Sequence, residues 1–408
     1  MKPSTSQPIR RRRFLGDLGL GAFGSVAAGG VLAAAGAEAE PPKIQGFDEV
    51  EEEAGSKDKW EPVSDRKIRM GIVGYGVCRF GAQFSLQYHP NVEVVAVSDL
   101  FPDRCRGLAE ACKCEKTYPS LEEMVEDDSI EAIFCATDAP SHCRHAIEVL
   151  SHGKHVATAV PAVFGSLEEA DQLFEAVKES GLNYMLFETS CYHSDLHAMR
   201  EIYKAGGFGK LLYSEGEYYH WCPTPIPSYK NWRVGLPPQW YPTHSNAYYV
   251  GVTGGSFTEV SCMGMPGILD HLQPENNAYG NPFGTEIALL RTTEGGMSRM
   301  ARSTDSPGFG GEVGRVRGQR GSMVGMNYRG LQKKLPDLRK PPLPPGVKPG
   351  GHGGSHGYLG HEFVMAILEE RQPLVDIVWA LNMTVAGVVA HQSALKEGEL
   401  MKIPQYPA

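Results

Sequence analysis

The sequence predicts an α/β protein whose first half is organised around a parallel sheet. Short apolar runs, each typical of a buried parallel strand, alternate with segments of helical pattern at residues 68–73, 92–97, 130–136, 155–160 and 182–187. This alternation indicates successive βαβ units. The turn Gly74-Tyr75-Gly76 stands directly between the first two runs. A glycine turn in that place predicts a doubly wound sheet that binds a nucleotide.

The chain begins with a segment that predicts export. Residues 11–15 read Arg-Arg-Arg-Phe-Leu, and a Gly/Ala-rich apolar stretch with small-residue cleavage sites follows. This pattern is typical of a twin-arginine signal peptide, which we place at 1–39, and of a periplasmic or otherwise exported protein that meets the export translocase during secretion. A retained membrane anchor is the alternative, although frequent glycines and Asp17 interrupt the apolar run. The membrane is a partner only in that alternative.

Charge and cysteine content narrow the class of protein. Residues 40–65 are acidic and contain Pro and Gly, which predicts a solvated linker. The chain has a net charge of −9, so electrostatics give no reason to expect nucleic acid as a partner. Nine scattered cysteines without a zinc-like spacing are interpreted mostly as buried thiols. His352, His356 and His361 lie in a Gly-rich setting that disfavours a helical ligand pair, and we predict no metal site.

The first turn has the residues that a dinucleotide requires. Gly74 permits a tight turn, and Gly76 lets the backbone approach a pyrophosphate at the positive end of a following helix. Arg79 stands where a third glycine is usual and can pair with a phosphate, while Gly81 follows two residues later. Asp99 ends the second strand, where its carboxylate suits a ribose and repels a 2′-phosphate. We therefore predict NAD, bound by Gly74, Tyr75, Gly76, Arg79 and Asp99; the alternative is a structural glycine turn.

The rest of this half continues the alternation of strands and helices. We expect a helix at 103–112 and another capped by Ser120. The loop Thr-Asp-Ala-Pro-Ser-His at 137–142 follows the strand at 130–136, so Thr137 and His142 are expected at the cofactor. His142 has two interpretations, which are packing beneath the nicotinamide and closing the loop.

Three stretches, GIVGYG, IFCATDAPSH and GKHVATAVPAVFGSLEEA, resemble the nucleotide half of the Gfo/Idh/MocA oxidoreductase family. The resemblance covers roughly residues 66–408. It implies a Rossmann NAD-binding domain at 66–187 and a second α/β domain with an open, mainly antiparallel sheet at 188–408. It also implies a sugar or glycoside substrate, and we expect a homo-oligomer.

Two positions depart from the dehydrogenases of this family. The family has Glu-Lys-Pro after the strand at 155–160, and its lysine binds and polarises the reacting hydroxyl. This chain has Ala159-Val160-Pro161 there, and a valine neither donates nor relays a proton. Of the family's Asp-x-Gly-x-His motif, this chain has only the histidine, His244. The usual acid–base arrangement is therefore absent.

Other motifs point to one branch of the family. They are Val-Pro-Ala at 160–162, Cys-Tyr at 191–192, Tyr-Pro-Thr-His at 241–244 and Gly-His-Gly-Gly at 351–354. They are similar to exported NAD-dependent glycosidases that act on α-N-acetylgalactosamine, and this resemblance implies that Tyr192, Tyr241 and His244 are catalytic. The branch has a glutamate where this chain has Ala159. Tyr192 can also be interpreted as a core residue, and His244 as a cap at a helix start.

The second half is expected to supply the open sheet and the closing helices. The stretch 336–357 is Pro/Gly-rich and long for a loop, which favours a lid or an interface arm. Aromatic residues between 218 and 232 suit stacking on a sugar face or packing between domains. We expect strands at 210–218, 257–263, 285–291 and 314–324, the last with a turn or bulge at Gly321, and helices at 195–205, 358–371 and 376–397.

These observations predict an exported NAD-binding oxidoreductase that acts on a sugar or glycoside by hydride transfer. The alternatives are a redox-neutral glycosidase or lyase and a non-catalytic sugar-binding protein. In the redox-neutral case, oxidation of one hydroxyl acidifies the neighbouring C–H, and a tyrosinate or imidazole removes that proton. Tyr241 and His244 are expected on one helical turn, where a protonated His244 would lower the pKa of the tyrosine.

Overall fold

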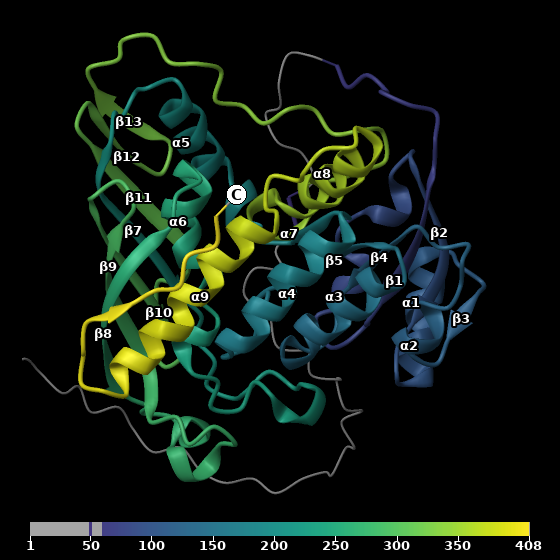
Figure 1. Cartoon of the computed structure of the whole chain (residues 1–408), viewed down its shortest axis with the longest axis horizontal. Helices are drawn as coiled ribbons and strands as arrows, with labels where there is room; N and C mark the ends of the chain where they lie inside the picture. Colours follow the sequence, from purple (N-terminus) through teal and green to yellow (C-terminus); the bar gives the residue numbers. More distant parts are fainter. Residues whose placement is uncertain (1–48, 51–58, 408) are drawn as a thin grey trace, which may run out of the picture. The chain divides into compact units, whose positions relative to one another are not determined.

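The computed structural model describes residues 49–50 and 59–407, which form one compact unit (Figure 1). The predicted signal peptide at 1–39 lies outside the described residues, as does most of the predicted linker at 40–65.

A parallel sheet forms the first half, as the sequence predicts. Its strands are β1 Ile68–Val73, β2 Val92–Ser98, β3 Thr117–Tyr118, β4 Ala132–Cys135, β5 His155–Thr158 and β6 Tyr184–Leu186. They lie in the order β3-β2-β1-β4-β5-β6, and all neighbours are parallel. The apolar side chains of β1 and β4 are almost fully buried, as expected for strands covered on both faces. The strand order reverses between β1 and β4, which is where ligands of doubly wound sheets bind.

Four α-helices connect these strands. They are α1 Pro102–Cys112, α2 Leu121–Met124, α3 His142–Ser151 and α4 Leu167–Ser180. The Ser120 hydroxyl accepts a hydrogen bond from the Glu123 amide at 3.2 Å and caps α2, as predicted. Ser166 caps α4 in the same way through the Glu169 amide.

The helix expected after Gly76 is not formed. Between β1 and β2, a fully described part of the chain, only two 3-10 turns occur, η1 Phe80–Ala82 and η2 Leu86–Tyr88. Arg79 and Ser85 precede these turns with φ of 50° and 56°. This left-handed conformation interrupts a right-handed helix. The prediction of a helix dipole at the pyrophosphate was therefore wrong.

Gly81 replaces the missing third glycine in the packing of this turn. A Cβ at Gly81 would lie 2.4 Å from the carbonyl oxygen of Gly74 and 3.0 Å from Leu108 of α1. The segment after the turn thus packs against the end of β1 at a distance that only glycine allows.

The second half contains a mixed sheet of eight strands. They are β7 Leu211–Tyr219, β8 Phe257–Pro266, β9 Phe283–Thr292, β10 Met297–Ser303, β11 Gly311–Gly318, β12 Gly321–Val324, β13 Asn327–Gly330 and β14 Met401–Lys402. Their order is β13-β12-β11-β7-β10-β9-β8-β14. Only the β7–β10 pair is parallel in this described sheet, so the mainly antiparallel prediction is confirmed. The strand expected at 314–324 divides at Gln319 and Arg320 into β11 and β12, and β10 was not predicted.

Helices on the second half position the site and join the two sheets. They are α5 Ser194–Lys204, α6 Thr243–Thr253, α7 Gly351–Gly354, α8 His356–Leu368 and α9 Ile377–Ala394. Helix α6 packs on β7, and α9 contacts both β6 of the first sheet and β8 of the second. Nearly every residue of α9 is buried, which explains why it is apolar on all sides. Within 49–50 and 59–407, no helix is both long and apolar enough to cross a bilayer.

Candidate active site

A cleft opens at the carboxyl ends of β1, β2 and β4, where the strand order reverses. Among the residues that line it are five of the predicted cofactor residues: Gly74, Gly76, Arg79, Asp99 and Thr137. The strand ends bring these residues together although they lie far apart in the sequence. Their common location fits a dinucleotide bound in the crevice outside the sheet.

The two turn glycines have different physical roles. Gly74 has φ of 100°, and a Cβ there would lie 2.3 Å from the Ala136 carbonyl oxygen, so the turn itself requires glycine. Around Gly76, apart from its two chain neighbours, no heavy atom of the described chain would lie within 4 Å of an added Cβ. This open space allows a phosphate to approach the backbone.

Cations replace the helix terminus that usually meets the pyrophosphate. Arg79, Arg104, Arg144, Lys230 and Arg233 all line the cleft. Side-chain guanidinium and ammonium groups bind phosphates through charge-assisted hydrogen bonds. The cleft can therefore hold the diphosphate of NAD without a helix N-terminus.

The carboxylate of Asp99 is held in a fixed orientation. It accepts hydrogen bonds from the Tyr75 amide at 2.7 Å and the Phe101 amide at 2.9 Å. The Tyr75 side chain is not among the residues that line the cleft; its ring lies beneath the Arg79 guanidinium at 5.7 Å. Tyr75 thus contributes through its backbone, which orients Asp99 for a ribose.

His142 lies behind the cleft wall rather than in it. Its Nδ1 is 2.8 Å from the Pro161 carbonyl oxygen, and its Nε2 is 3.2 Å from the Thr137 carbonyl oxygen. Burial lowers its pKa, although the two carbonyl oxygens oppose this effect, and the neutral ring has a single N–H that donates to one of the two carbonyls. His145, one helical turn later, lines the cleft and contacts the Thr137 hydroxyl at 2.8 Å. The position of His145 could have been predicted from the sequence, because residues three apart on a helix share a face.

A second pocket adjoins the cofactor cleft. Tyr241 and His244 line it, whereas Tyr192 does not. Cys78, Phe80 and Arg233 line both the pocket and the cleft, so a group bound in the pocket lies next to the cofactor. The structure thus places two of the three predicted catalytic residues together beside the predicted cofactor cleft.

Tyr192 occupies a core position behind the pocket. It is 8% exposed, and its hydroxyl has no hydrogen-bond partner among the described residues. Burial, reinforced by the nearby Glu362, raises its pKa well above 10. A neutral phenol outside the pocket fits the core interpretation of this residue.

Tyr241 and His244 touch, although not on a helical turn. Tyr241 follows the 3-10 turn η6 Pro238–Trp240, and α6 begins only at Thr243. The Tyr241 and His244 ring centroids are 5.5 Å apart. Burial raises the pKa of Tyr241, although Arg233 opposes this effect, so its phenol is neutral at neutral pH. The expectation that His244 lowers the pKa of the tyrosine below 10 was wrong.

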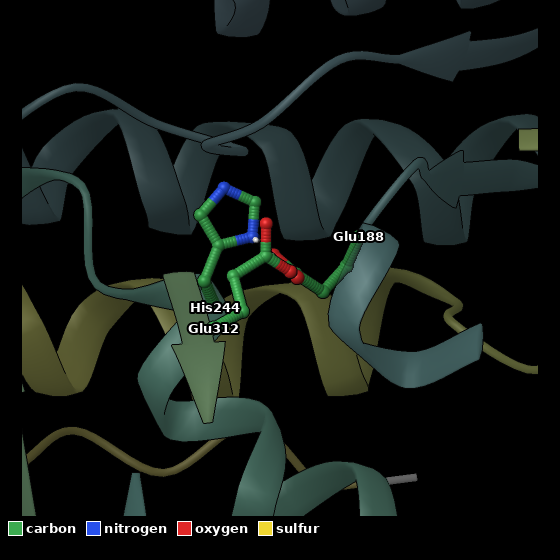
Figure 2. A group of neighbouring side chains, drawn as sticks. All are labelled: Glu188, His244 and Glu312. Carbon is green, nitrogen blue, oxygen red and sulfur yellow. Dashed lines mark hydrogen bonds and ion pairs between the residues drawn. The ribbon is translucent and has the colours of Figure 1, made fainter. Parts of the chain in front are cut away.

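His244 is instead clamped by two buried carboxylates (Figure 2). Its Nδ1 lies 2.7 Å from Glu188 Oε1 and 3.7 Å from Glu312 Oε2. Burial alone would lower the pKa of His244, but these two carboxylates outweigh it and raise the pKa to about 9. Figure 2 shows the second ring nitrogen pointing away from both carboxylates. His244 is therefore an imidazolium at neutral pH, with Nε2 directed away from its ion pair.

The same three side chains have the geometry of a metal site. One donor atom from each of Glu188, His244 and Glu312 lies within 4.8 Å of the others. Glu312 also accepts a hydrogen bond from Ser190 Oγ at 2.5 Å, and His244 and His193 lower its pKa to about 2 against the effect of burial. The proton on His244 thus already compensates part of the negative charge of the two carboxylates. The sequence interpretation missed both glutamates.

The positions where the family has acid–base groups are apolar here. Ala159 and Val160 line the same pocket as His244. His220 and His352 also line it, but burial lowers their pKa values to about 3 and about 4. His244 is therefore the group of this pocket that titrates nearest to physiological pH.

Comparison with known proteins supports this assignment of the two halves. Residues 68–187 match the sequence model of a family described as an oxidoreductase family with an NAD-binding Rossmann fold, GFO_IDH_MocA. The resemblance predicted from the sequence is confirmed, and the cofactor of this Rossmann half is NAD.

Curated relatives that match include glycosyl hydrolase family 109 proteins. The protein 1 of this family from Bacteroides fragilis is 29% identical over 177 residues, which cover 41% of this chain and 38% of the relative. A family 109 protein from Solibacter usitatus is 22% identical over 393 residues, which cover 83% of this chain and 88% of the relative. The chain thus spans 38% of the length of the first relative.

Solved structures show the same fold. A levoglucosan dehydrogenase in complex with NADH has a TM-score of 0.66 at 17% identity, covering 84% of this chain and 100% of that chain. A scyllo-inositol dehydrogenase from Lactobacillus casei, with bound NAD(H) and scyllo-inositol, has a TM-score of 0.64 at 15% identity. It covers 83% of this chain and 99% of that chain. The likeness confirms a Rossmann half followed by a second α/β half.

Proposed function

We propose that this protein is an NAD-dependent enzyme that oxidises a hydroxyl-bearing carbon of a sugar or glycoside by hydride transfer. The observation that carries the proposal is the pocket of Tyr241 and His244, which shares Cys78, Phe80 and Arg233 with the NAD cleft. The names of the similar proteins, which include glycosyl hydrolases and dehydrogenases of levoglucosan and scyllo-inositol, support a sugar as the substrate.

In this proposal NAD, when bound, supplies the hydride acceptor. His244 exchanges the proton of the reacting hydroxyl through Nε2, since its Nδ1 faces Glu188. The neutral imidazole accepts this proton during oxidation, and the imidazolium returns it during reduction. The clamp of Glu188 and Glu312 keeps the ring oriented and stabilises its charged form. Val160, which lines the same pocket, cannot donate a proton.

A redox-neutral glycosidase is the second candidate, and one observation favours it. The relatives are named as glycosyl hydrolases, and an imidazolium with a pKa of about 9 can stabilise the enolate oxygen that forms when the C–H beside a ketone is deprotonated. In that cycle, the glycosidic oxygen leaves and takes up a proton, water adds to the resulting enone, and the hydride taken from the sugar then returns to the ketone. The protein then needs no free NAD to exchange outside the cytoplasm.

Turnover in D2O separates these functions. The purified protein is loaded with NAD and mixed with candidate sugars and glycosides, while reduced-nicotinamide absorbance and deuterium incorporation beside the reacting carbon are followed. Steady NADH release supports the dehydrogenase. Deuterium incorporation with product but no net NADH supports the redox-neutral glycosidase. Neither signal, with a sugar still bound in calorimetry, contradicts both and leaves a sugar-binding protein.

We also propose that the protein is exported and self-associates. The Arg-Arg-Arg-Phe-Leu segment at 11–15 supports export by the twin-arginine route. The strand registers place several exposed apolar side chains on the face of the eight-stranded sheet opposite α6, a surface suited to a second copy of the chain. They are Met263, Met265, Leu289, Met297, Val313 and Val324.

A further inference from the structure

A third pocket adjoins the pocket of His244 and contains a buried guanidinium that has no counter-ion among the described residues. Arg302 of β10 is 3% exposed, and its Nε and Nη1 atoms have no hydrogen-bond partner within the described chain. Arg302 and Thr304 both line this pocket. The Thr304 hydroxyl is likewise buried and has no partner in the described residues. Several unused polar groups thus face one small space.

Two acidic residues close to Arg302 in the strand register or the sequence have other partners. Glu286, its cross-strand neighbour on β9, accepts a hydrogen bond from the Gln239 amide at 2.7 Å and lies 2.7 Å from His391 Nδ1. Asp305 accepts hydrogen bonds from the Thr285 hydroxyl at 2.8 Å and the Ile268 amide at 3.2 Å. Within the described residues, neither carboxylate forms an ion pair with the guanidinium, and neither is among the main charges that act on the pKa of Arg302.

Aromatic rings only partly compensate the buried charge. The Arg302 guanidinium lies 5.7 Å from the Tyr218 ring centroid and 5.8 Å from that of Tyr241. Cation–π contacts at such distances are weaker than a paired carboxylate. A buried charge is ordinarily paired, because leaving it without a partner is costly.

The third pocket lies next to the position proposed for the reacting sugar. His220, Ile226 and Arg233 line both the third pocket and the pocket of His244, and Arg233 also lines the NAD cleft. The Arg233 guanidinium stacks on Trp232 at 4.1 Å and forms no ion pair with a carboxylate among the described residues. Two arginines therefore face the same region, while His244 already has two carboxylates of its own.

We propose that Arg302, Thr304 and Arg233 form a binding site for an anionic group, a carboxylate or a sulfate ester, carried by the sugar substrate. The oxygens of such a group accept hydrogen bonds from Nε and Nη1 of Arg302 and from the Thr304 hydroxyl. The proposal rests on the proposed function in that it places the rest of the sugar in the pocket of His244. It narrows the substrate class to acidic sugars, such as uronides or sulfated sugars.

Matched sugars and one variant pair test this site. The binding of galactose, galacturonate and galactose 6-sulfate to the full-length protein with NAD is measured by calorimetry, and turnover of the corresponding methyl glycosides is measured separately. We expect the wild-type protein to bind at least one acidic sugar about tenfold or more tightly than the neutral sugar. The two acidic probes distinguish a carboxylate site from a sulfate site.

Arg302→Gln should remove this preference, while the exposed Arg329→Gln on β13 should keep it. Arg302 does not line the NAD cleft, so unchanged NAD affinity in Arg302→Gln shows that the variant is folded. Equal binding of neutral and acidic sugars by the wild type, or an intact preference in a folded Arg302→Gln, would overturn the proposal. Binding of an acidic sugar without turnover would refute the proposed hydride transfer and leave the anion site standing.

Discussion

At the scale of single residues, His244 determines how the proposed reaction depends on pH. Its pKa is raised to about 9, so at neutral pH nearly all molecules carry the imidazolium. Oxidation requires the neutral imidazole as proton acceptor. Reduction of a ketone requires the imidazolium. The two directions should therefore have opposite pH dependence around the same pKa.

We expect kcat/KM for oxidation to rise about tenfold per pH unit from neutral pH and to level off at about pH 9, where His244 loses its proton. His244→Gln should remove this limb. His391→Gln is a matched control, because His391 forms a similar buried pair with Glu286 at 2.7 Å and does not line the pocket of His244. A flat oxidation profile in the wild type, or an unchanged limb in His244→Gln, would refute the role of His244.

The residues of the cofactor cleft were more predictable from sequence than those of the substrate pocket. Gly74, Gly76 and Asp99 follow parallel strands, so their common location follows from the strand pattern alone. The histidine clamp joins three distant elements: Glu188 after β6, His244 on α6 and Glu312 on β11. Glu188 ends a recognisable strand and was open to prediction. Glu312 was not open to prediction, because β11 begins at Gly311 whereas the sequence pattern placed the start of this strand at residue 314.

At the scale of elements, the turn after β1 shows how tertiary contacts override a local helix pattern. Gly81 packs against the Gly74 carbonyl oxygen, and Arg79 takes a left-handed conformation just before it. The continuous apolar strands of the first sheet were predicted because both of their faces are buried. Strand β10 was missed because Arg299 and Arg302 break its apolar pattern. The partners of Arg299, Glu215 and Glu217, lie on β7, far away in the sequence.

Two glycine variants in this turn should separate cofactor binding from folding. A Cβ at Gly76 meets open space, so Gly76→Ala should leave stability unchanged and weaken NAD binding about tenfold by crowding the phosphate. A Cβ at Gly81 meets backbone at 2.4 Å, so Gly81→Ala should destabilise the protein by about 1–3 kcal/mol. Denaturant unfolding without NAD and calorimetry with NAD measure the two effects. Equal loss of stability in both variants would contradict the distinction.

At the scale of the whole molecule, the last helices make the two halves interdependent. Helix α9 contacts both β6 and β8, and α8 contacts the η2 turn of the nucleotide half. Residues from the end of the chain therefore pack against the first half. Because this packing joins distant parts of the chain, a boundary at residue 187 separates the two sheets but does not divide the hydrophobic core.

This interdependence bears on the proposed route of export. The nine cysteines are free thiols, and seven of them are buried. A core that contains buried thiols and requires both ends of the described chain is best completed, with NAD in place, before the protein leaves the reducing cytoplasm. The twin-arginine segment at 11–15 suits a protein exported in that folded state.

Replacing Arg11 and Arg12 with lysines should therefore retain the protein in the cytoplasm in a folded, NAD-bound form. Fractionation followed by detection of the protein measures its location, and the nicotinamide content of each fraction measures the bound cofactor. Arg10→Lys is the control, because it lies outside the Arg-Arg-Arg-Phe-Leu segment and should leave export unchanged. Normal export of the doubly substituted protein would show that this segment does not direct it. Exported wild-type protein without nicotinamide would show that folding around NAD does not precede export.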